Sequence, residues 1–234
     1  AAGVDTVMCG ELPTPGVAYL TRLRGYQAGV VVSASHNPCE DNGVKFFSAT
    51  GDKLPDGMEA DIERTMDQPM VCLPSSQLGR VSQLPEASSL YIEFCRKAVP
   101  AGVHLRGMKI VVDAAHGACH RIAPEVFRQL GAEVIAVGAS PDGQNINDKV
   151  GATSPQHLSA AVLAHQADVG VALDGDGDRL VMVDSDGRIF AGDELLYVLA
   201  VDAQTNDGLQ GGVVGTVMSN QGLELALQRR GIGF

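Results

Sequence analysis

The sequence is short of positive charge. It contains 17 lysine and arginine residues against 28 aspartate and glutamate residues, so its net charge is −11 at pH 7. Proteins that bind nucleic acids or anionic membranes need a basic surface that displaces counterions. We therefore expect no nucleic acid and no membrane as partners. A site for a phosphorylated ligand would need local cations to oppose the overall charge.

Paired cysteines, long apolar runs and a leader peptide are also lacking. The five cysteines are scattered and include no Cys-x-x-Cys pair, which favours free thiols over a disulfide framework or a zinc cluster. No apolar run approaches the length needed to cross a bilayer, and residues 1–10 lack the charged and hydrophobic regions of a signal peptide. These absences predict a cytoplasmic protein.

Strand and helix patterns alternate along the chain, and 234 residues with 45% hydrophobic content can bury a sizeable core. The alternation argues for a doubly wound α/β sheet. Asp-Ser-Asp-Gly at 184–187 predicts a hairpin. Strands are predicted at 4–8, 29–33, 44–47, 109–113, 133–137, 168–173, 180–183, 188–190 and 213–217, and helices after Thr14 and at 58–66, 124–130, 155–166, 193–203 and 223–230.

Residues 68–86 are rich in proline, serine and glycine, a composition typical of surface connections. We interpret 1–85 as a first domain, 86–190 as a second and 191–234 as the start of a third. In the first domain, strands 4–8 and 29–33 are expected to be parallel in a β-α-β unit. Both faces of the second strand should be buried, because its valines do not alternate with polar residues.

The chemistry is concentrated in two segments. Asp174, Asp176 and Asp178 alternate with glycines, so three carboxylates can converge on one hard cation such as Mg²⁺. A plain polar turn is the alternative; an EF-hand loop is excluded, because Arg179 and Ser185 occupy its glycine and glutamate positions. The second segment follows an apolar run and contains Ser33 and Ser35 before Asn37-Pro38. Either hydroxyl could be a nucleophile or could cap a turn.

The motifs together resemble a known family. Ser35-His36-Asn37-Pro38, then 41–45 (Asp-Asn-Gly-Val-Lys), then 174–179 (Asp-Gly-Asp-Gly-Asp-Arg) are similar in order and spacing to the α-D-phosphohexomutase superfamily. Within it, 45–48, 145–147 and 215–220 resemble the phosphoglucosamine mutases most. The resemblance covers essentially the whole chain. It implies tandem three-layer α/β/α domains with mixed, mostly parallel sheets.

The resemblance also implies roles for the site residues. Ser35 would be the phosphoserine and, with Asp174, Asp176 and Asp178, a ligand of Mg²⁺. Lys45 would be a general acid or base, His36 would orient its loop or act in catalysis, and Arg179 would hold a phosphate. The implied reaction interconverts glucosamine 6-phosphate and glucosamine 1-phosphate through a bisphosphate. Glucose or glucosamine 1,6-bisphosphate would activate the enzyme, which we expect to be a homodimer.

Two departures from the family pattern leave alternatives open. Cys39 stands where an aromatic residue is usual. The family's sugar-reading loop and phosphate-clamping domain have no counterpart in these 234 residues, so the chain reads as an excerpt. A phosphoglucomutase or phosphomannomutase remains an alternative. So does a catalytically incompetent fragment that retains metal and phosphoserine binding.

Overall fold

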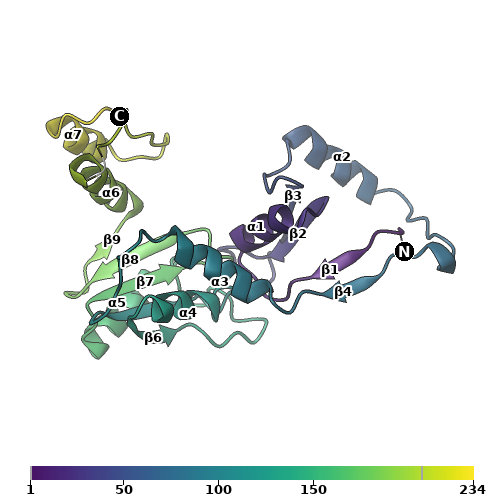
Figure 1. Cartoon of the computed structure of the whole chain (residues 1–234), viewed down its shortest axis with the longest axis horizontal. Coiled ribbons are helices and arrows are strands. Elements are labelled where there is room, and N and C mark those ends of the chain that lie inside the picture. Colours follow the sequence, from purple (N-terminus) through teal and green to yellow (C-terminus); the bar gives the residue numbers. More distant parts are fainter. Residues whose placement is uncertain (1, 207) are drawn as a thin grey trace.

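The computed structural model describes residues 2–206 and 208–234. The largest sheet has five strands, with two parallel pairings and two antiparallel ones (Figure 1). The α/β class and the mixed sheet are therefore confirmed, as is the hairpin formed by the last two strands. In spatial order the strands are β6 (Glu133–Val137), β5 (Lys109–Asp113), β7 (Val169–Leu173), β8 (Leu180–Asp184) and β9 (Ile189–Phe190).

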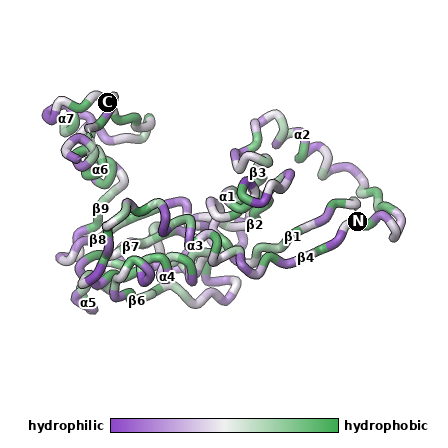
Figure 2. Tube along the Cα trace, viewed as in Figure 1, coloured by the Kyte–Doolittle hydropathy of each residue, from purple (hydrophilic) through white to green (hydrophobic). Residues whose placement is uncertain are grey.

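Both faces of this sheet are covered by helices, as expected for a three-layer domain. Ile110 and Val112 of β5 pack in the cluster that includes α4 (Ile122–Gln129). Val111 points the other way, into the cluster that includes α5 (Pro155–His165). Hydrophobic residues follow the strands between these helices (Figure 2). Each fully buried Val or Ile contributes about 1.5–3 kcal/mol, so this sheet is the main core.

The N-terminal region contains α1 (Thr14–Arg24), β2 (Ala28–Ser33), β3 (Gly43–Ser48) and α2 (Asp56–Met66). Strand β2 pairs antiparallel with β3. The predicted parallel β-α-β unit is wrong, because the first strand pairs elsewhere. Nor is β2 buried on both faces: Val31 is 7% exposed, whereas Val30 and Val32 are 52% and 70% exposed. Helix α1 covers one face of β2, and none of the described residues buries the other.

Strand β1 (Thr6–Met8) pairs parallel with β4 (Val81–Gln83), and the two form an extended ribbon beside the N-terminus (Figure 1). The interpretation of 68–86 as a plain connection was therefore incomplete. This segment contains β4 and a short 3₁₀ helix, η1 (Ser75–Gln77). A three-residue polar strand is recognisable only from its partner, because its side chains carry no period-2 hydrophobic signal.

Helix α3 (Ala87–Ala98), for which we predicted no element, joins the two larger regions. Its Tyr91 packs with Leu20 of α1 and Ile122 of α4 in one buried cluster. Stacking of Tyr19 on Phe94, with ring centroids 4.1 Å apart, adds an aromatic contact to this junction. The junction holds α1 beside the five-stranded sheet, which determines where the N-terminal loops meet it.

The C-terminal region contains α6 (Gly192–Asn206) and α7 (Gln221–Arg229), which stand apart from the five-stranded sheet (Figure 1). They pack on each other through Ala200, Leu223 and Leu227. The predicted strand at 213–217 is wrong, because the segment is irregular and no described strand pairs with it. Among the described residues, none of the helices is long and apolar enough to span a membrane.

Candidate active site

The loop that follows β2, residues 34–38, is called the Ser35 loop. Ser35 has a left-handed backbone with φ of 55°, and its N–H donates to Ser33 Oγ at 3.0 Å. Asn37 N–H closes the turn on the carbonyl of Ala34 at 2.9 Å. Ser33 therefore acts as an acceptor within the turn, whereas the hydroxyl of Ser35 donates outside it, to Asp176 Oδ1 at 3.1 Å.

The loop that follows β7, residues 174–179, is called the acidic loop. Asp174 is fully buried, and its Oδ1 accepts the N–H groups of Asp178 and Arg179 at 3.1 and 3.0 Å. Its Oδ2 is buried without a hydrogen-bond partner among the described residues. Asp174, Asp176 and Asp178 each offer one carboxylate oxygen, and these oxygens lie within 4.8 Å of one another.

Asp176 is the point at which the N-terminal region meets the acidic loop. Its Oδ2 accepts hydrogen bonds from Thr14 Oγ1 and from Lys45 Nζ, each at 2.6 Å. The carbonyl of Asp176 accepts the N–H of Thr14 at 2.9 Å. Lys45 Nζ also lies 3.5 Å from Asp178 Oδ2, so one ammonium bridges two carboxylates. Three elements, α1, β3 and the Ser35 loop, therefore converge on one buried aspartate.

The ionisation of these groups follows from burial and from their partners. Burial acts to raise the pKa of Asp176, but hydrogen bonds from Lys45 and Thr14 outweigh it and leave this pKa lowered. Burial acts to lower the pKa of Lys45, and its bond to Asp176 reverses the balance and raises it. The cation paired with Asp174, Arg179, is half exposed and 3.9 Å away, so burial, followed by the charges of Asp176 and Asp178, raises the pKa of Asp174.

His36 and Arg179 lie on the rim of the same site. Arg179 Nη2 is 3.5 Å from His36 Nε2, and Arg179 Nε is 3.9 Å from Asp174 Oδ2. About half of the Arg179 side chain is exposed, so its guanidinium can still reach an anion. The structure thus brings all of the predicted site residues together: Ser35, His36, Lys45, Asp174, Asp176, Asp178 and Arg179.

Two residues of the site were missed as site residues. Thr14 was predicted only as the start of a helix, and Asn147 only as part of a motif typical of the family. Asn147 donates to the carbonyls of Ser35 and Asn37 and accepts the N–H of Gly175. No local sequence signal marks these contacts. The bonds of Thr14 to Asp176 and of Asn147 to the Ser35 loop join segments more than 100 positions apart, and the bond of Asn147 to Gly175 spans 28 positions.

Gly175 shows how closely the two loops approach. A Cβ at this position would lie 2.5 Å from the carbonyl oxygen of Ser35 and 2.4 Å from Ile146 Cδ1. Both distances are well below van der Waals contact, so only glycine fits here. Gly175, between Asp174 and Asp176, therefore lets the backbone of Ser35 approach the acidic loop, and it also leaves room around the carboxylates.

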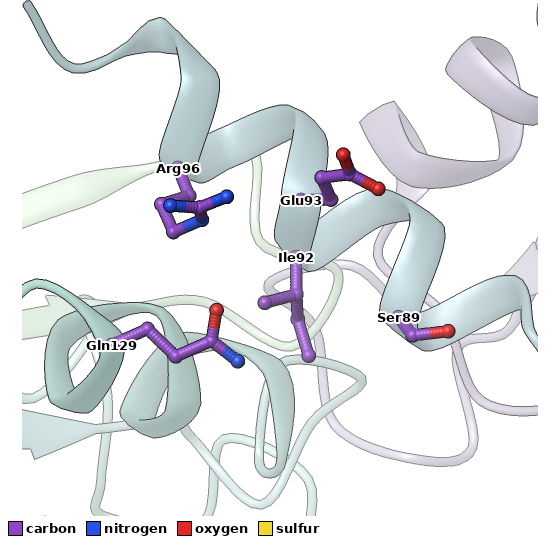
Figure 3. A pocket seen from close by; sticks show the side chains of 5 residues that line it. All are labelled: Ser89, Ile92, Glu93, Arg96 and Gln129. Atoms are coloured by element: carbon purple, nitrogen blue, oxygen red, sulfur yellow. The ribbon is translucent and has the colours of Figure 1, made fainter.

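A shallow cavity of about 330 Å³ lies elsewhere, between α3 and α4 (Figure 3). In Figure 3, Ile92, Arg96 and Gln129 are arranged around it. Arg96 and Gln129 also line a second cavity beside it, near the ends of these helices. Neither cavity is lined by residues of the Ser35 loop or of the acidic loop. The acidic cluster is therefore the part of the structure that carries the predicted chemistry.

Family models of the phosphoglucomutase/phosphomannomutase α/β/α domains I, II and III match residues 1–70, 89–187 and 191–234, respectively. The chain belongs to this family. The predicted resemblance to the phosphohexomutases is thus confirmed. The domain I match contains the Ser35 loop and Lys45, and the domain II match contains the acidic loop. The site is therefore built where two domains of the family meet.

Relatives within the family are close. The phosphoglucosamine mutase of Aromatoleum aromaticum is 58% identical over 234 residues, which are 100% of this chain and 52% of that protein. A phosphoglucomutase/phosphomannomutase family protein from Burkholderia thailandensis has a similar structure, with a TM-score of 0.77 and 28% identity over 99% of this chain and 51% of that one. A putative phosphomannomutase from Thermus thermophilus has the same fold, with a TM-score of 0.80 and 23% identity over 99% and 54%. The chain spans about half the length of the curated relatives it matches.

The acidic cluster of this family member fits a hard divalent cation. A fully buried carboxylate oxygen without a partner, such as Asp174 Oδ2, is costly unless a cation or a donor compensates it. Carboxylate oxygens from two further aspartates lie within reach of the same point. Oxygen ligands of this kind suit Mg²⁺ better than they suit softer metals.

Proposed function

We propose that the chain is part of a phosphoglucosamine mutase that interconverts glucosamine 6-phosphate and glucosamine 1-phosphate through phospho-Ser35. The observation that carries the proposal is the Ser35 hydroxyl, 3.1 Å from Asp176 at the edge of a three-carboxylate cluster. Relatives at 56–59% identity over the whole chain are named phosphoglucosamine mutases, which favours this sugar over the glucose or mannose phosphates.

Asp174, Asp176 and Asp178 would hold Mg²⁺, and an oxygen of phospho-Ser35 would be a further ligand. The bound cation would neutralise negative charge on the transferring phosphoryl group. In this arrangement Asp174 supplies the buried oxygen that lacks a protein partner, and Asp178 supplies an exposed one. Thr14 holds Asp176 in place from the side of α1.

The transfer needs little covalent chemistry from the protein. The bond between phosphorus and Ser35 Oγ breaks, a bond from phosphorus to the free sugar hydroxyl forms, and the proton of that hydroxyl is released as Ser35 Oγ takes one up. The bisphosphate then reorients and returns its other phosphate to Ser35. Such a reaction depends mainly on positioning and on charge stabilisation.

The remaining side chains have roles that suit their places. Lys45 contacts both Asp176 and Asp178, and Asp176 accepts the hydrogen bond of the Ser35 hydroxyl, so Lys45 would act as general acid or base one residue away from Ser35. Arg179 is half exposed and can bind a phosphate through two of its N–H groups. His36 lies against Arg179 and would orient the Ser35 loop. Activation by glucose or glucosamine 1,6-bisphosphate, the homodimer and the domain limits of 85 and 190 stay predictions.

The test is phosphate labelling. The chain is incubated with Mg²⁺ and glucose 1,6-bisphosphate, and peptide mass spectrometry then locates the phosphate. We expect label at Ser35 and loss of label in Ser35→Ala. In Ser33→Ala we expect the label still at Ser35 but formed more slowly, because this variant removes the acceptor of the Ser35 N–H. The same experiment on a chain extended to the full length of the relatives separates a missing donor site from a wrong nucleophile. Label at Ser33 alone, or no label in either form, contradicts the proposal.

The incompetent-fragment alternative has a separate test. The chain spans about half of each curated relative, so the labelling step and full turnover can be compared in the short and the extended forms. We expect the 234-residue chain to fold but to turn over glucosamine 6-phosphate far more slowly than the extended form in a coupled assay. Equal turnover in both forms would show that these residues suffice.

A further inference from the structure

The side chain of Asn147 uses its whole amide to join two loops. Its Nδ2 donates to the carbonyl of Ser35 at 2.8 Å and to the carbonyl of Asn37 at 2.9 Å. Its Oδ1 accepts the N–H of Gly175 at 3.0 Å. An asparagine amide has two N–H donors and one carbonyl acceptor, and all of them are engaged. No donor of this side chain remains to serve a ligand.

The backbone that carries this side chain is itself held in place. Asn147 has a left-handed conformation, with φ of 58°, which asparagine tolerates better than most residues. Its N–H donates to the carbonyl of Ala115 at 2.9 Å, in the loop after β5. The N–H of Ala115 in turn donates to the fully buried carboxylate of Asp113 at 3.0 Å. These bonds connect the backbone of Asn147 to the end of β5.

The groups that Asn147 satisfies have few alternatives. Gly175 is buried, so its N–H would lose its partner if the amide were removed. The carbonyl of Ser35 lies against the Cα of Gly175, where a Cβ would come within 2.5 Å of it. Ser35 also has a left-handed backbone, with φ of 55°, which is costly for serine unless its surroundings fix it. Asn147 is one of the contacts that fix it.

We propose that Asn147 is a positioning residue that sets the Ser35 hydroxyl at its working distance from the three aspartates. The inference rests on the proposed function, in which phosphate passes through Ser35. Thr14 and Lys45 bind the acidic loop through Asp176, whereas Asn147 links the backbones of both loops. A shift of about 1 Å between reacting groups can cost on the order of a hundredfold in rate.

Two substitutions and one matched control separate the amide from the backbone. Asn147→Gly removes the amide and accepts the left-handed φ. Asn147→Asp keeps an acceptor for Gly175 N–H and loses both donors to the Ser35 loop. Lys149→Gly is the control, because Lys149 is exposed, lies in the same loop and has φ of 57°.

The first measurement is hydrogen exchange of the 234-residue chain, which needs no metal and no turnover. We expect Asn147→Gly to speed exchange roughly tenfold or more in peptides that cover both loops, because the substitution removes all three hydrogen bonds of the amide. Asn147→Asp should speed exchange in the Ser35 loop and leave Gly175 protected, whereas Lys149→Gly should change neither loop. Unchanged exchange in Asn147→Gly, equal changes in Lys149→Gly, or faster exchange throughout the chain overturns the proposal.

The second measurement is the initial rate of Ser35 labelling by glucose 1,6-bisphosphate, in the chain form that the wild-type experiment labels. We expect Asn147→Gly to lower this rate on the order of a hundredfold, while Lys149→Gly stays near wild type. A wild-type rate in Asn147→Gly overturns the positioning role. Absence of label in every wild-type form overturns the proposed function instead, and the exchange pattern still decides whether Asn147 holds the two loops together.

Discussion

Thr14 and Asp176, which lie 162 positions apart in the sequence, are joined by two hydrogen bonds. The hydroxyl of Thr14 donates to the carboxylate at 2.6 Å, and its N–H donates to the carbonyl at 2.9 Å. Both side chains are buried, so water does not compete for these bonds. Asp176 is therefore fixed from the N-terminal region by a neutral partner as well as by the ammonium of Lys45.

Thr14→Val tests the neutral contact. Valine keeps the shape of threonine but cannot donate to Asp176, and a buried acceptor that loses one partner costs about 1–3 kcal/mol. We expect the free energy of unfolding, measured by urea denaturation, to fall by that amount. Thr50→Val is the control, because Thr50 is exposed and its hydroxyl bonds to Ser48 and Asp52 in an exposed turn, where water can replace the lost bonds. A control as destabilised as Thr14→Val would argue against a special role for the buried bond.

Asp176→Asn tests the acidic cluster as a cation site. The substitution removes the charge of a carboxylate that Lys45, Thr14 and Ser35 all contact. A hard cation bound there would have few other protein oxygens as ligands. We expect calorimetric titration with Mg²⁺ to show strongly weakened binding. Asp186→Asn, in the exposed turn between β8 and β9, should bind as the wild type does. Equal affinity in the two variants would make the acidic loop structural.

Gly175→Ala and Gly57→Ala should have opposite effects on stability. At Gly175 the new Cβ would meet the carbonyl oxygen of Ser35 at 2.5 Å, and overpacking of this kind costs about 1–3 kcal/mol. Gly57 is the second residue of α2 and has nothing within 4 Å of its Cβ position, so alanine should stabilise the protein by about 0.4–1 kcal/mol, mainly by restricting the unfolded chain. Thermal denaturation of both variants gives the comparison. Similar melting temperatures would mean that the Ser35 loop can move away from the new Cβ at little cost in stability.

The buried thiol of Cys119 should make the free energy of unfolding fall as the pH rises above 9. Burial, aided by the charge of Asp174, raises the pKa of its thiol from an ordinary 9.0 to about 12. The folded pKa is the higher one, so the contribution is fully present below pH 9 and is lost as the pH rises toward 12. At pH 10 the loss is about 1.4 kcal/mol, because only the unfolded chain is then mostly ionised at this thiol.

Denaturation at pH 7 and pH 10 measures this effect. The difference between the two pH values should be smaller by about 1.4 kcal/mol in Cys119→Ala than in the wild type. Cys72→Ala is the control, because Cys72 is exposed. A pH dependence that persists unchanged in Cys119→Ala would assign it to other groups.

The five-stranded sheet could be predicted because its strands carry their own signal. Buried parallel strands read as continuous apolar runs, and 109–113 and 168–173 have that form between helix patterns. The apolar run at 213–217 has a similar composition and forms no strand. A strand is stable only beside a partner, and the partner is not encoded in the run itself. The same reason explains why the pairing of β1 with β4 was not foreseen.

The site divides in the same way. Ser35, Lys45 and the three aspartates belong to motifs whose order and spacing are informative in the amino-acid sequence alone. Thr14 and Asn147 act through contacts that exist only after α1 and the loop after β6 have met the acidic loop. Their side-chain types are ordinary for a helix start and a turn, so the sequence offered no reason to place them at the centre.

Helix α1 begins without a capping side chain of its own, because its N-cap residue is Pro13. The N–H of Thr14 is satisfied by the carbonyl of Asp176, Pro15 has no N–H, and the N–H of Gly16 bonds to Pro13. The cap is thus contributed by the acidic loop, a distant segment of the same chain. Unfolding of the N-terminal helix and unfolding of the five-stranded sheet are thereby thermodynamically coupled, and a peptide of residues 1–85 would begin this helix with a donor that only water could satisfy.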